Sequence, residues 1–218
     1  MNMLAIETSS SKGSIALQVG NLLRQVVLAQ QRQQLTEILP TIDSLLSQQH
    51  LQVRQLDALV FSAGAGSFTG IRIALGIAQG LALAADIPVA VVPSLQALAQ
   101  TAWRLHRYQH VFCCINAYMQ QIYAATYKLH GDQLMHPVVT GQLLSPKAVR
   151  QWRLPNYHGV GDAWQAYGNS LQSNVIDKTL LFPEAQDLLT LLPIIKMAAI
   201  DDVVVHYLRG KSAWQRPD

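Results

Sequence analysis

Charged residues are scarce in this chain of 218 residues, of which only 13% are Asp, Glu, Lys or Arg. An average soluble domain carries about 25% charged residues, so few side chains here keep the surface hydrated. Half of the residues are hydrophobic, which excludes an intrinsically disordered chain and allows a sizeable core. We expect part of the apolar excess to be covered by a partner.

Cysteine is also scarce, and the only two are Cys113 and Cys114. Neighbours on a strand point to opposite faces, so the pair does not predict a mutual disulfide, and no CxxC metal spacing is present. The sequence opens without a signal-peptide pattern. Its most apolar stretch, 71–85, is shorter than the roughly 18 residues that indicate a membrane span. We therefore expect a soluble, cytoplasmic protein in a reducing compartment, with no membrane partner.

A strong charge of one sign is absent as well. The formal net charge is +3, and the sixteen Lys and Arg residues are scattered along the chain. An RNA-binding module usually shows a basic stripe with interleaved aromatic residues. Its absence disfavours a self-sufficient RNA-binding domain.

The first half of the sequence predicts strands alternating with helices. Gly20-Asn21 is a hairpin signal between two apolar runs, so a three-stranded meander opens the chain. Pro40 lies inside the next helical pattern and predicts a kink or a late start, and Ser94 is the expected N-cap of a later helix. The expected strands cover 3–8, 14–19, 23–28, 58–62 and 89–92, and the expected helices cover 35–49, 69–84 and 94–106. This order predicts an α/β protein with a mixed sheet flanked by helices.

The second half predicts a further unit of the same kind. We place the boundary near residue 105, with an N-terminal lobe at 1–105 and a smaller C-terminal lobe at 106–218. The expected strands cover 111–116, 122–127 and 138–143, and the expected helices cover 145–152, 163–171 and 185–197.

A glycine-rich loop between a strand and a helix is the most informative segment. Gly64, Gly66 and Gly70 permit close backbone approaches, and Ser67 or Thr69 is able to cap the helix that follows. A helix N-terminus behind such a loop suits an anion, but the spacing is neither that of a P-loop nor GxGxxG. Phosphate binding and a structural or partner-facing turn both remain open.

The helix after this loop carries apolar residues on every side. The larger ones do not keep to one stripe, and a helix of this kind must be covered all round. Gly76 and Gly80 leave a flat strip that another helix could approach. Burial between layers of the chain's own fold and a subunit interface are both open. The larger apolar residues are Ile71, Ile73, Leu75, Ile77, Leu81 and Leu83.

The segment 62–80 resembles the signature of the TsaB (YeaZ) family: a strand, a glycine loop, Ser-Phe-Thr-Gly, and a helix rich in small residues. The resemblance runs over nearly the whole chain. Further matching segments are Leu4-Ala5-Ile6-Glu7-Thr8, Leu39-Pro40, Pro93-Ser94-Leu95, Gly159 to Trp164, Tyr207-Leu208-Arg209 and Trp214. The chain departs from the family pattern at Glu7 (usually Asp), Ala65 (often Pro), Gln34-Leu35 (His-Ser/Thr), Asn116-Ala117-Tyr118 (Asp-Ala-Arg) and Gln121 (Glu).

This resemblance implies a two-lobed fold of the actin, Hsp70 and sugar-kinase type. It also implies a role in making N6-threonylcarbamoyladenosine (t6A) beside the anticodon of tRNA. In that pathway TsaC makes threonylcarbamoyl-AMP, TsaD transfers the group to tRNA, and the ATPase TsaE joins the complex. A TsaB-like chain is the non-catalytic subunit that pairs with TsaD, and it forms a homodimer when TsaD is absent. The chain itself is expected to hold no cofactor or metal, with ATP and a metal in the partner subunits and tRNA bound only through the complex.

The expected partner-binding surface lies on two helices, those at about 35–49 and 69–84. An interface of this kind should be apolar, in agreement with the second helix. The residues predicted to bind the partner are Leu35, Ile38, Leu39 and Ile42 on the first helix, and Phe68, Ile71, Arg72, Ile73, Leu75, Gly76, Gln79 and Gly80 on the second.

Chemistry of the chain's own is weakly indicated. His106 and His110 are spaced to share a metal on a helix, but no further ligand lies close by in the sequence. Ser67 has no evident catalytic partners. The alternative to a TsaB-like subunit is a stand-alone actin-fold phosphotransferase, in which Glu7 and the serines 9–11 would hold ATP.

Overall fold

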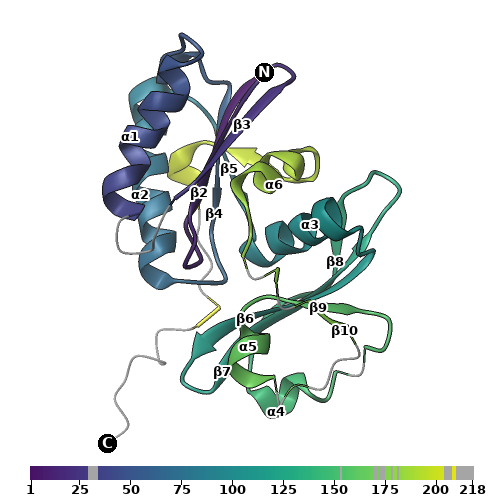
Figure 1. Cartoon of the computed structure of the whole chain (residues 1–218). Helices are drawn as coiled ribbons and strands as arrows, with labels where there is room; N and C mark the ends of the chain where they lie inside the picture. Colours follow the sequence, from purple (N-terminus) through teal and green to yellow (C-terminus); the bar gives the residue numbers. More distant parts are fainter. Residues whose placement is uncertain are drawn as a thin grey trace, which may run out of the picture.

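The computed structural model describes residues 1–28, 34–152, 154–168, 171, 175–177, 179–180, 182–203 and 208–209. Two β-sheets organise the chain, with helices on both faces of each (Figure 1). The predicted α/β class with mixed sheets is confirmed.

The first sheet has six strands in the order β11-β5-β4-β1-β2-β3. β1, β2 and β3 form the antiparallel meander predicted from Gly20-Asn21, whereas β1, β4 and β5 are parallel. β1 and β4 are continuous apolar runs because helices cover both of their faces. The strands are β1 (Asn2–Glu7), β2 (Ser14–Val19), β3 (Leu22–Val27), β4 (Ala58–Ser62), β5 (Val89–Val92) and β11 (Met197–Ala198).

One face of this sheet carries α1 (Gln34–Ser47) and α2 (Phe68–Ala85), which lie beside each other in Figure 1. The opposite face carries α6 (Ala185–Thr190), whose Leu188 packs with Ala5 and Val60. The 3₁₀ turns are η1 (Val53–Gln55), η2 (Leu192–Ile194) and η3 (Ile200–Asp202).

The second sheet has five strands in the order β10-β9-β6-β7-β8. α3 (Ser94–His106) covers one face, and α4 (Pro146–Val149) and α5 (Ala163–Tyr167) cover the other. The cores on these two faces hold Cys113 and Cys114 respectively, which are both buried and free, as their adjacency on a strand predicted. The strands are β6 (His110–Tyr118), β7 (Gln121–Leu129), β8 (Met135–Leu144), β9 (His158–Val160) and β10 (Val175–Ile176).

Several local predictions need correction. The N-cap of α3 is Pro93, and Ser94 is already the first helical residue. α1 begins at Gln34 and continues through Pro40, so a late start at the proline is wrong. The three helices predicted after residue 144 are shorter than expected, and α6 ends before Pro193, which begins η2.

The strands β9, β10 and β11 were not predicted, and each has only two or three residues. The division of the chain near residue 105 stays a prediction. α6 and β11 come from the C-terminal half but lie on the first sheet. Tyr207 and Trp214, which carried part of the resemblance, lie outside the described residues.

Candidate protein-interaction surface

The glycine loop fastens α2 to the end of β1. The Ser67 side chain accepts a hydrogen bond from Gly70 N–H at 3.2 Å, so Ser67, one of the two predicted candidates, is the N-cap. Thr8 Oγ1 donates to the Gly70 carbonyl at 2.7 Å, and Ser67 N–H donates to the Ser9 carbonyl at 2.6 Å. A Cβ at Gly70 would collide with the Thr8 carbonyl oxygen. These contacts favour the structural interpretation of the glycines over phosphate binding.

The inner face of α2 consists of small residues. Gly70, Ala74, Ala78 and Ala82 recur every four residues and are buried, so the helix lies close to β4. Larger side chains are displaced to the flanks: Ile73, Leu75, Ile77 and Leu81 are half-buried. The large residues keep to no single stripe, as the sequence indicated, and the small residues mark the side that is buried on the sheet.

The outer face of α2 is open. The Arg72 guanidinium lies 3.7 Å from the centroid of the Phe68 ring, and Phe68 is 37% exposed. A Cβ at Gly76 or Gly80 would meet no atom within 4 Å. Leu83, one turn further on, is 62% exposed, and it was missing from the predicted site. The helix therefore presents a shallow strip of glycine between apolar ends, which another helix could approach closely.

α1 contributes less to this surface than predicted. Leu39 is 53% exposed, but Ile38 and Ile42 are buried in the core of the first sheet. On α2, Ile71 is buried as well. This burial corrects the prediction for these three isoleucines, because their side chains already contact the chain's own core. The side chain of Leu35 lies outside the described part.

We call the exposed residues the α1–α2 face. Its members come from two helices that lie on one side of the first sheet (Figure 1). They are Leu39, Phe68, Arg72, Gly76, Gln79, Gly80 and Leu83, with Ile73 and Leu75 half-buried at its border.

α2 is also the one helix in the described ranges that is long and apolar enough to span a membrane by length and composition. It has 18 residues and a mean hydropathy of 1.5, so the expected 15-residue stretch was too short. Ala74 and Ala78 are nevertheless fully buried against the sheet. The packed inner face identifies α2 as a helix of the globular core with one uncovered side.

The cavity at the end of β1 has no available carboxylate at the position of Glu7. Glu7 is completely buried, and its Oε1 accepts hydrogen bonds from Ser9 N–H and Ser9 Oγ, each at 2.6 Å. Burial raises the pKa of this carboxyl group. The cavity that contains Ser9, Ser10 and Ser11 has a volume of about 170 Å³. Ligand pockets usually measure roughly 300–1,000 Å³, so this geometry disfavours the ATP site considered above.

Asp162 and Asn116 line the other side of this cavity. Asp162 Oδ1 accepts a hydrogen bond from Asn116 N–H at 2.7 Å, and burial raises the pKa of Asp162. Tyr118 and Met119 form the exposed tip of the β6–β7 turn beside it. Asn116 and Tyr118 are departures from the family pattern, and here they shape the turn: Asn116 Oδ1 accepts from Tyr118 N–H at 2.8 Å.

The histidine pair is not arranged as a metal site. His106 Nε2 lies 3.4 Å from Asp177 Oδ2, and its ring stacks on Tyr108. The His110 ring makes an edge contact with Tyr157. No group of three or more His, Cys, Asp or Glu residues in the described part is placed to hold a metal ion.

The sequence matches, over residues 21–188, the family model described as TsaD, tRNA N6-adenosine threonylcarbamoyltransferase. Among curated proteins, it is 32% identical to the tRNA threonylcarbamoyladenosine biosynthesis protein TsaB of Haemophilus influenzae, over 99% of this chain and 97% of the relative. It is also 32% identical to TsaB of Escherichia coli, over 99% of this chain and 98% of the relative.

Comparison with solved structures points to the same family. The structure titled YeaZ from Pseudomonas aeruginosa has a TM-score of 0.87 and 29% identity, and the match covers 95% of this chain and 99% of that one. A second structure from the same organism, described as an uncharacterized protein with similarity to peptidase YeaZ, has a TM-score of 0.88. The fold predicted from the resemblance, of the actin, Hsp70 and sugar-kinase type, is confirmed by this likeness.

Proposed function

The chain belongs to the TsaB (YeaZ) family, and on that premise we propose that it is the non-catalytic subunit of the t6A-forming complex. It pairs with the transferase TsaD and, together with TsaE, supports transfer of threonylcarbamoyl from threonylcarbamoyl-AMP to the adenosine beside the anticodon. Transfer chemistry and tRNA binding belong to the assembled complex, and the site of action is the cytoplasm. This proposal takes precedence over the stand-alone phosphotransferase.

The α1–α2 face carries the proposal. It combines an apolar character with two open glycines on a helix that is otherwise packed tightly on its sheet. Helices pack with their axes roughly 8–10 Å apart, and small residues at the crossing allow the closest approach. A matching pair of helices of TsaD would therefore cover Phe68, Gly76 and Leu83. Without TsaD, the same face of a second copy takes that place in a two-fold dimer.

The cavity beside Glu7 is too small for a nucleotide, which supports the accessory role. Glu7 is enclosed and already accepts two hydrogen bonds from Ser9. At the opposite side of the cavity, the Asp162 carboxylate accepts a hydrogen bond from Asn116 N–H. Both carboxylates therefore act in local structure.

The experiment is a reconstitution with TsaC, TsaD and TsaE from the same organism. t6A formation is measured while wild-type chain or Gly76→Arg is titrated in. The matched control is Gly131→Arg, because Gly131 lies in the turn after β7 and a Cβ there meets no atom within 4 Å. The proposal predicts product with the wild type and the control but not with Gly76→Arg. Equal product with all three variants would refute the interface, and product without any added chain would refute the function.

A further inference from the structure

β3 is an edge strand with open main-chain groups. It ends the strand order of the first sheet, and no strand in the described ranges pairs with its outer side. Leu28 N–H donates to the Gly13 carbonyl at 2.8 Å, which fixes the alternation of hydrogen-bonded pairs between β2 and β3. By this alternation the N–H and C=O groups of Leu23, Gln25 and Val27 point away from β2. Such a row of groups is a template for another strand.

The side chains of this edge are apolar on both faces of the sheet. Leu22 and Val26 are 42% and 39% exposed on one face, and Leu23 and Val27 are 42% and 54% exposed on the other. Natural edge strands are usually protected by several charges, by proline or by a bulge. β3 has one charged residue, Arg24, and pairs with β2 in unbroken register. An edge strand of this composition is suited to pairing with a strand from another chain.

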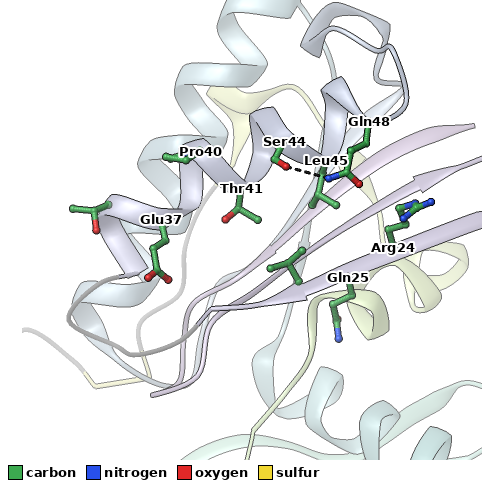
Figure 2. Close-up of a pocket in the computed structure, with 10 residues that line it drawn as sticks. Arg24, Gln25, Glu37, Pro40, Thr41, Ser44, Leu45 and Gln48 are labelled. Atoms are coloured by element: carbon green, nitrogen blue, oxygen red, sulfur yellow. Dashed lines mark hydrogen bonds between the residues drawn. The ribbon is translucent and has the colours of Figure 1, made fainter.

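A groove runs beside this edge, between β3 and α1. Its volume is about 570 Å³. Arg24 and Val26 line it from the strand, and Thr41, Ser44 and Leu45 are among the residues that line it from the helix. Figure 2 shows Arg24 and Gln25 on opposite sides of β3, with Arg24 on the side of α1 near Gln48. A strand added to β3 would direct alternate side chains into this groove.

Charge identifies the kind of occupant. Two charged side chains line the groove, Arg24 and Glu37, and Glu37 already has an interaction partner. Arg24 is exposed and forms no hydrogen bond or ion pair with any residue that the structure describes. On the other face, the side chain of Gln25 is already engaged: it donates to Glu184 Oε2 and accepts from Gln186 N–H. The unpaired guanidinium therefore favours a carboxylate on the occupant.

A second copy of the chain is a poor occupant. β3 contains no acidic residue, so its twin offers no partner to Arg24. Antiparallel pairing of two β3 strands about Gln25 would place both Arg24 side chains on one face, close to each other, which is unfavourable.

We propose that β3 and the β3–α1 groove bind an extended segment of another protein, which adds as a strand to β3 and places an Asp or Glu side chain beside Arg24. Main-chain hydrogen bonds at Leu23, Gln25 and Val27 provide the affinity, and the groove selects the alternate side chains. The α1–α2 face remains free for a different partner, so this inference does not depend on the proposed function.

The test uses the full chain and two capped heptapeptides of alternating Val and Thr, one with a central Glu and one with a central Lys. We expect the glutamate peptide to bind saturably by NMR titration and to slow amide exchange at Leu23, Gln25 and Val27. The Arg24→Glu variant should bind the glutamate peptide about tenfold more weakly and should bind the lysine peptide instead. Lys128→Glu, an equal charge change on β7 of the second sheet, should have no effect.

A second variant separates the main-chain contribution. Val27→Pro removes one outward N–H and leaves the β2–β3 bonds in place, so the glutamate peptide should no longer bind while the spectrum stays folded. No saturation at millimolar peptide, amide protection on another strand, or equal binding by Arg24→Glu would each overturn the proposal. Dimerisation of the free chain that Val27→Pro abolishes would overturn it in favour of a second copy.

Discussion

Replacement of Gly76 by Arg is the sharpest perturbation of the proposed interface with TsaD. Gly76 lies in the middle of the outer face of α2, where a new side chain meets no atom of this chain. Arg is a better helix former than Gly by about 0.7 kcal/mol, so the free chain should unfold at an equal or slightly higher temperature. Any loss of pairing is then separate from a loss of folding.

The effect on pairing should be large. A long cation at a helix crossing separates the two helices, and it loses hydration without a partner. An uncompensated charge buried at a contact costs roughly 3–5 kcal/mol, and 3 kcal/mol corresponds to more than a hundredfold in Kd. Calorimetric titration with TsaD should therefore show binding by the wild type and by Gly131→Arg, and none by Gly76→Arg at micromolar concentrations. Tight binding by Gly76→Arg would place the interface elsewhere.

Three further predictions concern the fold that positions this face. Gly70→Ala should lower the free energy of unfolding, measured by urea denaturation, by about 3 kcal/mol or more, because the new methyl group collides with the Thr8 carbonyl. A change below about 1 kcal/mol would refute that close contact. Arg104→Ala should lower the free energy of unfolding by about 3–5 kcal/mol, because it leaves the buried Asp187 without its hydrogen bonds from Arg104 Nε and Nη2 at 2.9 and 3.0 Å. Arg107→Ala, at the same end of the helix, is the control and should lower it by less than about 1 kcal/mol. Burial raises the pKa of Glu7 above its unfolded value of 4.5, so its contribution to stability is present below that pH and is lost as pH rises through the folded pKa. Glu7→Gln should therefore gain stability relative to wild type as pH rises above 4.5 in denaturation curves. A difference that stays constant with pH would contradict the burial argument.

The main elements of the fold were predictable because their signals are local. The turn at Gly20-Asn21 and a cap at Ser67 or Thr69 were both predicted from a few neighbouring residues, and the turn and the Ser67 cap are present. β9, β10 and β11 were missed because strands of two or three residues carry no period. Their pairing depends on neighbours distant in the sequence.

The interaction surface was only partly predictable. The choice of α1 and α2 rested on the resemblance and stays a prediction. Leu39, Phe68 and Leu83 are exposed on these helices, whereas Ile38, Ile42 and Ile71 are buried. The direction in which α2 faces is decided by Ala74, Ala78 and Ala82, whose small size lets the helix approach β4 closely. The open edge of β3 was not visible in the sequence either, since an apolar strand reads the same at the centre and at the edge of a sheet.

The measurement that tests the central claim most directly is t6A formation on tRNA by TsaC, TsaD and TsaE of the same organism, with this chain titrated in. As the partner of TsaD, the chain should raise product formation until it saturates near one chain per TsaD. Equal product formation in its absence would contradict the assignment as a subunit of that complex.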